Sequence, residues 1–243
     1  MKGYSKSMNE IIRKRKSIRK YEAAPLDTAT LDWVGEQIAA VKPLYPNIRY
    51  NIEIANKTKG LFNVKAPHYL IFSSEEMDGY CENIGFIGQQ LDLALSENGI
   101  GTCWLGGSKP SENEKTKLTY VIAMAFGKPT EPLHRSLDEF KRKPLSAISE
   151  GEGVRLEAVR LAPSAMNSQN WFFVAYSEKI HCYRKKINPI AGLMLERLNR
   201  IDMGIAICHI AAESANLEQF KFTKSKVAPE RKGYIYTGTA LCP

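Results

Sequence analysis

The stretch richest in groups able to bind a flat organic ligand is LAPSAMNSQNWFFV, residues 161–174. A helical pattern runs into Pro163, small polar residues follow, and Asn167 and Gln169 stand just before an apolar run. Each amide can donate and accept at once, which suits the N–H and C=O edge of a planar heterocycle. The alternative is a turn whose Asn and Gln only satisfy its own backbone groups, and the spacing by itself favours that alternative.

Two short basic segments could bind a phosphate group, RKSIR at 15–19 and FKRKP at 140–144. Arginine contacts two phosphate oxygens at once, and serine adds a neutral donor. The first segment lies within RKRKSIRK, residues 13–20, where six of eight residues are basic. Alone, this run is typical of a solvated helix end, or it could contact nucleic acid. A nucleic-acid role is disfavoured because the four histidines lack zinc-ligand spacing and no heptad repeat is present.

A glycine-rich stretch, GIGTCWLGG at 99–107, stands where a helical pattern ends and a strand pattern begins. Its glycines allow the backbone to approach a ligand closely. It is not a GxGxxG turn, and Lys109 is not placed as a P-loop lysine, so dinucleotide and ATP cradles are disfavoured. No Ser/His/Asp or Cys/His set emerges, and Cys103 is expected to be a packed small residue. We therefore predict neither a catalytic side chain nor a metal site.

Periodicity predicts the elements that must position these groups. Helices are expected through Leu31–Val41, Ile84–Leu95, Leu156–Val159 and Ile201–Ala212, and strands at Tyr50–Ile54, Tyr69–Phe72, Thr102–Leu105, Leu118–Phe126, Trp171–Tyr176 and Tyr234–Thr239. Pro43 and Pro163 end two of the helices, and Asn98-Gly99 caps a third. Residues 178–200 are expected to be a helix-loop surface, or else part of a lid over a ligand pocket.

The order of these elements repeats along the chain. A polar, proline-bearing stretch at 129–144 divides it, and an offset of 120 places Pro43 on Pro163 and Asn47 on Asn167. We expect a duplicated half-domain. The expected domains are a first half at 1–128, a linker crossing at 129–146 that carries the basic phosphate-binding segment, and a second half at 147–243.

Composition limits the class of protein. The chain has 243 residues, 44% apolar and 25% charged, with a formal net charge of +8. These values exclude disorder and collagen-like repeats, and the length is ample for a buried core. Apolar runs such as Met203–Cys208 are too short to span a bilayer, and MKGYSKSMNE offers no signal-peptide core. The five cysteines form no CxxC pair, so a reducing, cytoplasmic setting is expected.

Taken together, four segments resemble the FMN-dependent nitroreductase family. They are RKSIR at 15–19, GIGTCWLGG at 99–107, FGKP at 126–129 followed by KRKP at 141–144, and APSAMNSQNWFFV at 162–174. The resemblance covers most of the chain. It implies an oxidoreductase that moves electrons from NAD(P)H through FMN to a flat acceptor such as a nitroaromatic or quinone. Hydride would pass through flavin N5 in ping-pong order, and the flavin would carry the chemistry.

The resemblance also implies which residues bind the cofactor. Arg15, Lys16, Ser17 and Arg19 would contact the phosphate, ribityl chain and pyrimidine edge, and Arg142 would complete the phosphate site. Ile100, Gly101, Thr102, Leu105, Gly106 and Gly107 would line the isoalloxazine or ribityl side. Pro163, Ser164, Ala165, Asn167 and Gln169 would approach the flavin from the opposite side.

The motif order departs from the usual pattern of that family. The Pro-Ser motif typically follows the basic motif closely and reaches the flavin of a neighbouring subunit, whereas here it lies in the second half. Each half has therefore kept one side of the site. The sequence resembles a two-half subgroup and predicts an α+β, nitroreductase-like fold. Its duplicated half-domains, each a mainly antiparallel sheet flanked by helices, would form an intrachain pseudo-dimer. A monomer or weak homodimer with a small-molecule acceptor, and with neither nucleic acid nor membrane, is then expected.

Two other functions stay open at this point. An incomplete duplication could have lost the acceptor pocket, leaving a non-catalytic flavin-binding redox sensor or store. The basic run could instead bind nucleic acid, with an affinity that falls steeply with salt. The sequence does not distinguish NADH from NADPH as the donor.

Overall fold

The computed structural model describes residues 8–60, 64–111, 116–151, 156–188, 192–213 and 220–241. The chain forms two compact units. One, here called the N-unit, is Lys14–Ser136, and the other, the C-unit, combines Met1–Arg13 with Leu137–Pro243. The C-unit is thus built from both ends of the chain. The domain boundaries expected from the sequence stay a prediction.

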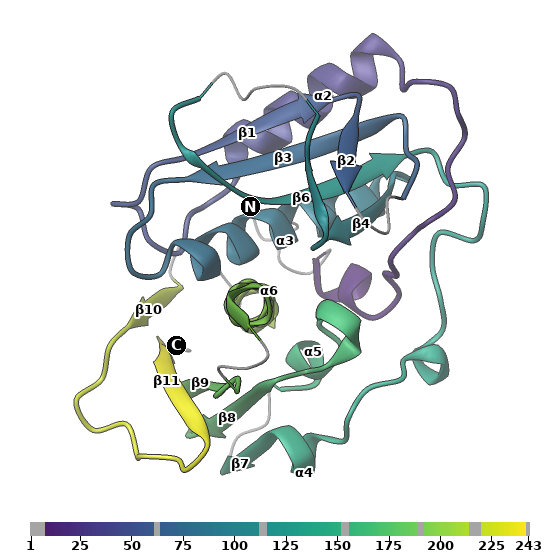
Figure 1. Ribbon diagram of the computed structural model, residues 1–243. Coiled ribbons are helices and arrows are strands. Elements are labelled where there is room, and N and C mark those ends of the chain that lie inside the picture. The colour runs from purple at the N-terminus through teal and green to yellow at the C-terminus, as the bar shows by residue number, and fades with distance from the viewer. Residues whose placement is uncertain are drawn as a thin grey trace. The chain divides into compact units, whose positions relative to one another are not determined.

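The N-unit is built on a four-stranded antiparallel sheet (Figure 1). Its strands are β1 (Tyr50–Ala55), β3 (His68–Ser74), β4 (Gly101–Leu105) and β6 (Thr119–Gly127), in the order β1-β3-β6-β4. Helix α2 (Thr28–Ala40) packs on α3 (Tyr80–Glu97), and α3 packs on β3 and β4. The short strands β2 (Thr58–Gly60) and β5 (Ser108–Pro110) form a separate antiparallel pair. Every residue of β3 is buried, as expected for an apolar strand in the middle of a sheet.

Local sequence explains where the N-unit helices begin and end. The Asp27 side chain accepts a hydrogen bond from Thr30 N at 2.7 Å, which caps the start of α2. Helix α3 ends at Asn98, whose side chain donates to Ala94 O at 3.0 Å. Gly99 follows with a φ of +82°, a left-handed conformation that glycine adopts without steric cost. The predicted ends of both helices are confirmed.

The C-unit contains a five-stranded sheet in the order β10-β11-β9-β8-β7 (Figure 1). The strands are β7 (Ser149–Gly151), β8 (Trp171–Ala175), β9 (Lys179–Lys185), β10 (Lys221–Thr223) and β11 (Tyr234–Leu241). Only the β7–β8 pair is parallel among these described strands. The helices are α4 (Leu145–Ile148), α5 (Glu157–Arg160) and α6 (Gly192–Glu213), with 3-10 turns η1 (Leu137–Glu139) and η2 (Ala165–Asn167). The long helix α6 packs on β9, β11 and α5.

The expectation of a helix-loop surface over residues 178–200 is wrong for its first part. Lys179–Lys185 form β9, a central strand that pairs with both β8 and β11. Ile180, His181, Cys182 and Tyr183 are all buried. The polar residues in this strand conceal it from a pattern search, because both of its faces are covered and apolar alternation is absent.

Each unit, taken by itself, has the same order of main elements. The N-unit runs α2, β1, β3, α3 and β6, with β3 between β1 and β6. The C-unit runs α5, β8, β9, α6 and β11, with β9 between β8 and β11. The predicted α+β class with mainly antiparallel sheets is confirmed, whereas the pseudo-dimer arrangement stays a prediction. Among the described helices, none combines the length and apolarity that crossing a membrane requires.

Candidate functional site

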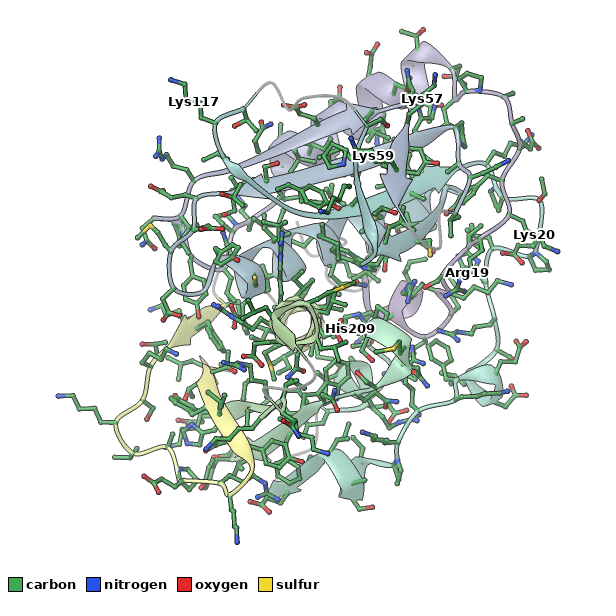
Figure 2. The ribbon with its side chains drawn as sticks, viewed as in Figure 1. Arg19, Lys20, Lys57, Lys59, Lys117 and His209 are labelled. Carbon is green, nitrogen blue, oxygen red and sulfur yellow. The ribbon has the colours of Figure 1, made fainter. Side chains whose placement is uncertain are left out.

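In the N-unit, the first basic segment is an extended chain rather than a helix end. Residues 14–22 run antiparallel to 128–135, with bridges from Arg15 to His134 and from Tyr21 to Pro129. Ile18 N donates to Thr102 O at 2.8 Å, so the segment also lies beside β4. The structure therefore brings RKSIR next to the glycine-rich stretch within this unit. Arg19 and Lys20 are exposed, and Lys20 extends away from the chain (Figure 2).

Arg15 is withdrawn from the surface into a buried polar network. Its side chain is 1% exposed, and its Nε lies 3.0 Å from Asp92 Oδ2 on α3. The Thr102 hydroxyl donates to the other Asp92 oxygen, and Gln89 Nε2 donates to Asp92 Oδ2 at 2.8 Å. Gln89 Oε1 in turn accepts from Trp104 Nε1 at 3.3 Å. Asp92 thus links the basic segment to the strand that carries Thr102.

The Arg15 guanidinium still has donor capacity. Its Nη2 donates to Ser17 Oγ at 3.3 Å, whereas Nη1 has no hydrogen-bond partner among the described residues. The contact from Nε to Asp92 is an ion pair without hydrogen-bond geometry. A buried donor without a partner costs about 1–3 kcal/mol, and an anionic or carbonyl oxygen of a ligand would satisfy it. This orphaned donor fits the phosphate or pyrimidine edge of a flavin nucleotide.

The other N-unit residues expected at the site have different environments. Ile100, Gly101, Thr102 and Leu105 are buried, Lys16 and Ser17 are half-buried, and Gly106 and Gly107 are exposed. A Cβ on Gly101 would lie 2.8 Å from Ile18 Cγ1, so glycine is needed there for close packing. Burial raises the pKa of the Cys103 thiol, which agrees with a packed residue rather than a nucleophile.

In the C-unit, the Pro-Ser motif forms a strained loop at residues 163–169. Met166, Asn167 and Gln169 have φ values of 52°, 54° and 47°. They are the only non-glycine residues with positive φ in the described parts of the chain. Such conformations cost roughly 1–3 kcal/mol each and persist only where surrounding contacts hold them. Strain of this kind collects at ligand sites, so the loop is a candidate binding element.

The second basic segment holds one side of this loop. Arg142 Nη1 donates to Asn167 Oδ1 at 2.6 Å, and its Nε and Nη2 donate to the carbonyls of Ala162 and Leu161 at 3.1 and 3.3 Å. Asn167 Nδ2 returns a bond to Lys141 O at 2.6 Å. The structure therefore brings Arg142 and Asn167 together, a pairing that the sequence did not predict, and it gives Arg142 a role the sequence did not indicate. The guanidinium contacts the loop backbone and positions it.

Lys143 and Gln169 add further contacts between the same two segments. Lys143 N donates to Gln169 Oε1 at 2.9 Å, and Lys143 Nζ donates to the carbonyls of Ser168 and Gln169 at 2.7 and 3.2 Å. Burial and the nearby Lys185 lower the pKa of Lys143. Gln169 is 3% exposed, and its amide bonds to Lys143 N and Asn167 O within the protein. For Gln169, the observed contacts agree with the alternative in which its amide satisfies backbone groups of the protein.

Three polar residues of these networks were not predicted from the sequence: Gln89, Asp92 and Asp202. Asp202 Oδ1 and Oδ2 lie 3.1 and 3.0 Å from Ala165 N, and Asp202 is 5% exposed. Asp92 and Asp202 both stand within long helices among buried residues. A carboxylate inside an apolar helical stretch is rarely tolerated without a partner, and this was the available indication.

The histidines have structural partners. His209 extends from α6 toward α5, where its Nδ1 lies 2.7 Å from Ala158 O (Figure 2). His134 Nε2 lies 3.3 Å from Ser96 O, and burial is the main cause that lowers its pKa. Within the described ranges, no three His, Cys, Asp or Glu side chains gather as a metal ion would need.

Comparisons with known proteins agree with the motif pattern. A family model described as "Putative TM nitroreductase" matches residues 7–214. None of the curated proteins is similar enough to count as a match. A crystal structure of a "putative nitroreductase" from Thermotoga maritima aligns with 97% of this chain and 93% of its own, at 21% identity and a TM-score of 0.66. It shares the fold over nearly the whole chain.

Shorter proteins align with part of the chain. An "NADH dehydrogenase/NAD(P)H nitroreductase" of Parabacteroides distasonis covers 60% of this chain and 98% of its own, at 15% identity and a TM-score of 0.46. An "FMN-dependent Nitroreductase" of Clostridium difficile covers 55% and 96%, at 16% identity and a TM-score of 0.42.

Proposed function

The chain belongs to the family described as "Putative TM nitroreductase", and we propose that it is an FMN-dependent oxidoreductase. Its donor is NAD(P)H, and its acceptor is a flat molecule such as a nitroaromatic or a quinone. The observation that carries the proposal is the buried Arg15 guanidinium, whose Nη1 has no partner within the described residues. A fixed cation with an unused donor, in a segment that bonds to the glycine-rich stretch at Thr102, favours an anionic ligand with a planar part.

The residues that would hold FMN are those predicted from the motifs. Arg15, Lys16, Ser17 and Arg19 offer cationic and hydroxyl donors for the phosphate and ribityl groups. The loop at 163–169 offers backbone groups and the exposed Asn167. Arg142 supports the proposal by its bonds to that loop, and a direct contact with the phosphate is part of the proposal.

Bound FMN would supply hydride acceptance from the nicotinamide and its later transfer to the acceptor. The chain's own residues bind and orient the flavin and exclude water from it. Neither acid-base catalysis nor nucleophilic attack by a side chain is assigned. This division of labour is consistent with the raised pKa of the buried Cys103 thiol.

The first test is the visible absorbance of the purified full chain, with the released chromophore identified and counted per chain. We expect about one FMN per chain, together with rapid NADH or NADPH oxidation when a quinone is added. Bound FMN without turnover would favour the redox sensor or store. A chain that takes up no flavin from excess FMN would overturn the proposal.

The second test is the FMN affinity of Arg15→Ala beside that of Lys20→Ala, an exposed basic residue of the same run. Loss of one charge-assisted phosphate contact costs about 1.5–3 kcal/mol, or about tenfold to a hundredfold in affinity. The control should bind FMN as the parent does. Equal affinities for both variants would refute the assignment of Arg15.

A further inference from the structure

Asp202 is a buried acidic residue to which the proposed function gives no role. It lies on α6, is 5% exposed, and directs both carboxyl oxygens at one backbone group, Ala165 N, at 3.1 and 3.0 Å. Ala165 opens η2, and the Ser164 side chain makes no capping hydrogen bond there. The Asp202 carboxyl, 37 positions away along the chain, therefore accepts the hydrogen bond that a local capping side chain would otherwise accept.

The bond acts where the loop is strained. Met166, Asn167 and Gln169, the three non-glycine residues with left-handed φ in the described parts of the chain, lie within four residues after Ala165. Inside the loop, Asn167 N donates to Ser164 O and Gln169 N donates to Ser164 Oγ, each at 3.0 Å. Arg142 holds the loop at Asn167, and Asp202 holds it at Ala165. Strained backbone persists only when fixed from outside, and these two side chains fix it.

The chemistry of the carboxyl fits this task. Burial raises the pKa of Asp202 to about 8, and the Ala165 N–H lowers it in part. An apolar residue of similar size would cost nothing to bury, whereas a carboxyl is costly there. A purely structural residue of α6 would therefore not need to be acidic.

We propose that Asp202 is a positioning residue that holds the 163–169 loop, through Ala165 N, in the conformation that meets the ligand. The inference rests on the proposed flavin site, because that loop is one of its two groups of residues. Asp202 does not touch the ligand in this account.

The experiment compares three full-chain variants. Asp202→Leu removes the hydrogen-bond acceptor of Ala165 N, and Asp202→Asn keeps one accepting oxygen in the same place. Asn199→Leu is the matched control: Asn199 is also buried on α6, 4% exposed, but its Nδ2 donates to Lys185 O at 2.8 Å rather than to a residue of the loop. Circular dichroism and thermal unfolding establish that each variant folds.

The first readout needs no flavin. Met166 is 80% exposed within the loop, so a methyl-labelled methionine spectrum, assigned with Met166→Leu, reports the loop conformation. Asp202→Leu should shift the Met166 methyl resonance, and Asp202→Asn should largely restore it. Asn199→Leu should leave it at the parent position. An unshifted resonance in folded Asp202→Leu would overturn the inference.

The second readout is the FMN dissociation constant. We expect Asp202→Leu to weaken binding about tenfold, equivalent to about 1.4 kcal/mol, and Asp202→Asn and Asn199→Leu to stay near the parent value. If the parent binds no FMN but the resonance responds to Asp202, the proposed function fails and the positioning role stands. If the parent binds FMN and Asp202→Leu binds it equally well, the positioning role fails and the function stands.

Discussion

Arg15 and Asp92 form an ion pair in which each side chain is only 1% exposed. Desolvation of two charges offsets most of their attraction, so such a pair adds little net stability over apolar residues. Removal of one partner is far more costly, because the other charge stays buried. The pair fixes the Arg15 guanidinium, whose Nη1 has no hydrogen-bond partner within the described residues and is therefore left for a ligand.

We expect Arg15→Ala to lower the free energy of unfolding by about 3–5 kcal/mol, because Asp92 is left uncompensated. The double variant Arg15→Met with Asp92→Asn should recover most of that loss and still bind FMN poorly. Urea unfolding and flavin titration measure the two effects separately. The exposed pair of Lys128 and Glu22 is the control, and Lys128→Ala should change stability by less than about 1 kcal/mol. An equal loss in the single and double variants would contradict this account.

Asp202 gives stability a pH dependence of known sign. Burial raises its pKa to about 8 in the folded chain from an ordinary value of 3.8, so between these values the folded state binds the extra proton. The free energy of unfolding should therefore fall as pH rises from about 4 to about 8. Asp202→Asn lacks this term, and its stability relative to the parent should increase over that range. Urea midpoints at several pH values give the difference, and a constant difference would speak against the raised pKa.

Helices α2 and α3 differ in how closely other side chains pack against their glycines. A Cβ on Gly35 of α2 would meet nothing within 4 Å. A Cβ on Gly88 of α3 would lie 2.3 Å from Trp104 Cη2 and 3.2 Å from Phe72 Cζ. Trp104 stacks on Phe72 and bonds to Gln89, so close packing here also fixes the network around Asp92.

We expect opposite effects from the same substitution in these two helices. Gly35→Ala should stabilise the chain by about 0.5–1 kcal/mol, because alanine loses less backbone entropy in a helix. Gly88→Ala should destabilise it by about 1–3 kcal/mol, because the Trp104 ring must move. Thermal unfolding gives the signs, and Trp104 fluorescence should change only in Gly88→Ala. Two changes of the same sign would show that helix propensity outweighs packing.

The motif groups are divided between the N-unit and the C-unit. Arg15 and the glycine-rich stretch belong to the N-unit, and the 163–169 loop belongs to the C-unit. The sequence places one copy of each group in a chain. The family resemblance predicts that one FMN requires both groups and that both come from the same chain, and this stays a prediction.

Co-expression of Arg15→Ala with Gln169→Ala tests this expectation. If both groups come from one chain, each chain carries one defect and the mixture should bind FMN no better than the separate variants. If neighbouring chains exchange the groups, a mixed dimer would contain one intact set and recover part of the binding. Light scattering on the same samples gives the mass, which we expect to be that of one chain. Recovered binding together with a dimer mass would refute the single-chain arrangement.

Features that depend on near neighbours along the chain follow from the amino-acid sequence alone. Helix α2 ends before Pro43, α3 ends at Asn98-Gly99, and the alternation of Tyr50, Ile52 and Ile54 marks β1. The motif residues likewise indicated the family, because types and spacing are written along the chain. The predicted helix through Leu156 and Val159 appears as α5, Glu157–Arg160 among the described residues, and it ends before Pro163.

The pairing of the polar groups, in contrast, depends on the fold. Arg15 meets Asp92 across 77 positions, Arg142 turns to the loop at Asn167, and Asp202 reaches Ala165. Strand β9 became central through its pairing with β8 and β11 rather than through its own pattern. Secondary-structure propensity and hydrophobic periodicity depend on residues that are close in the chain. A buried charge or an inner strand is stable only beside partners that the fold brings from distant parts of the chain.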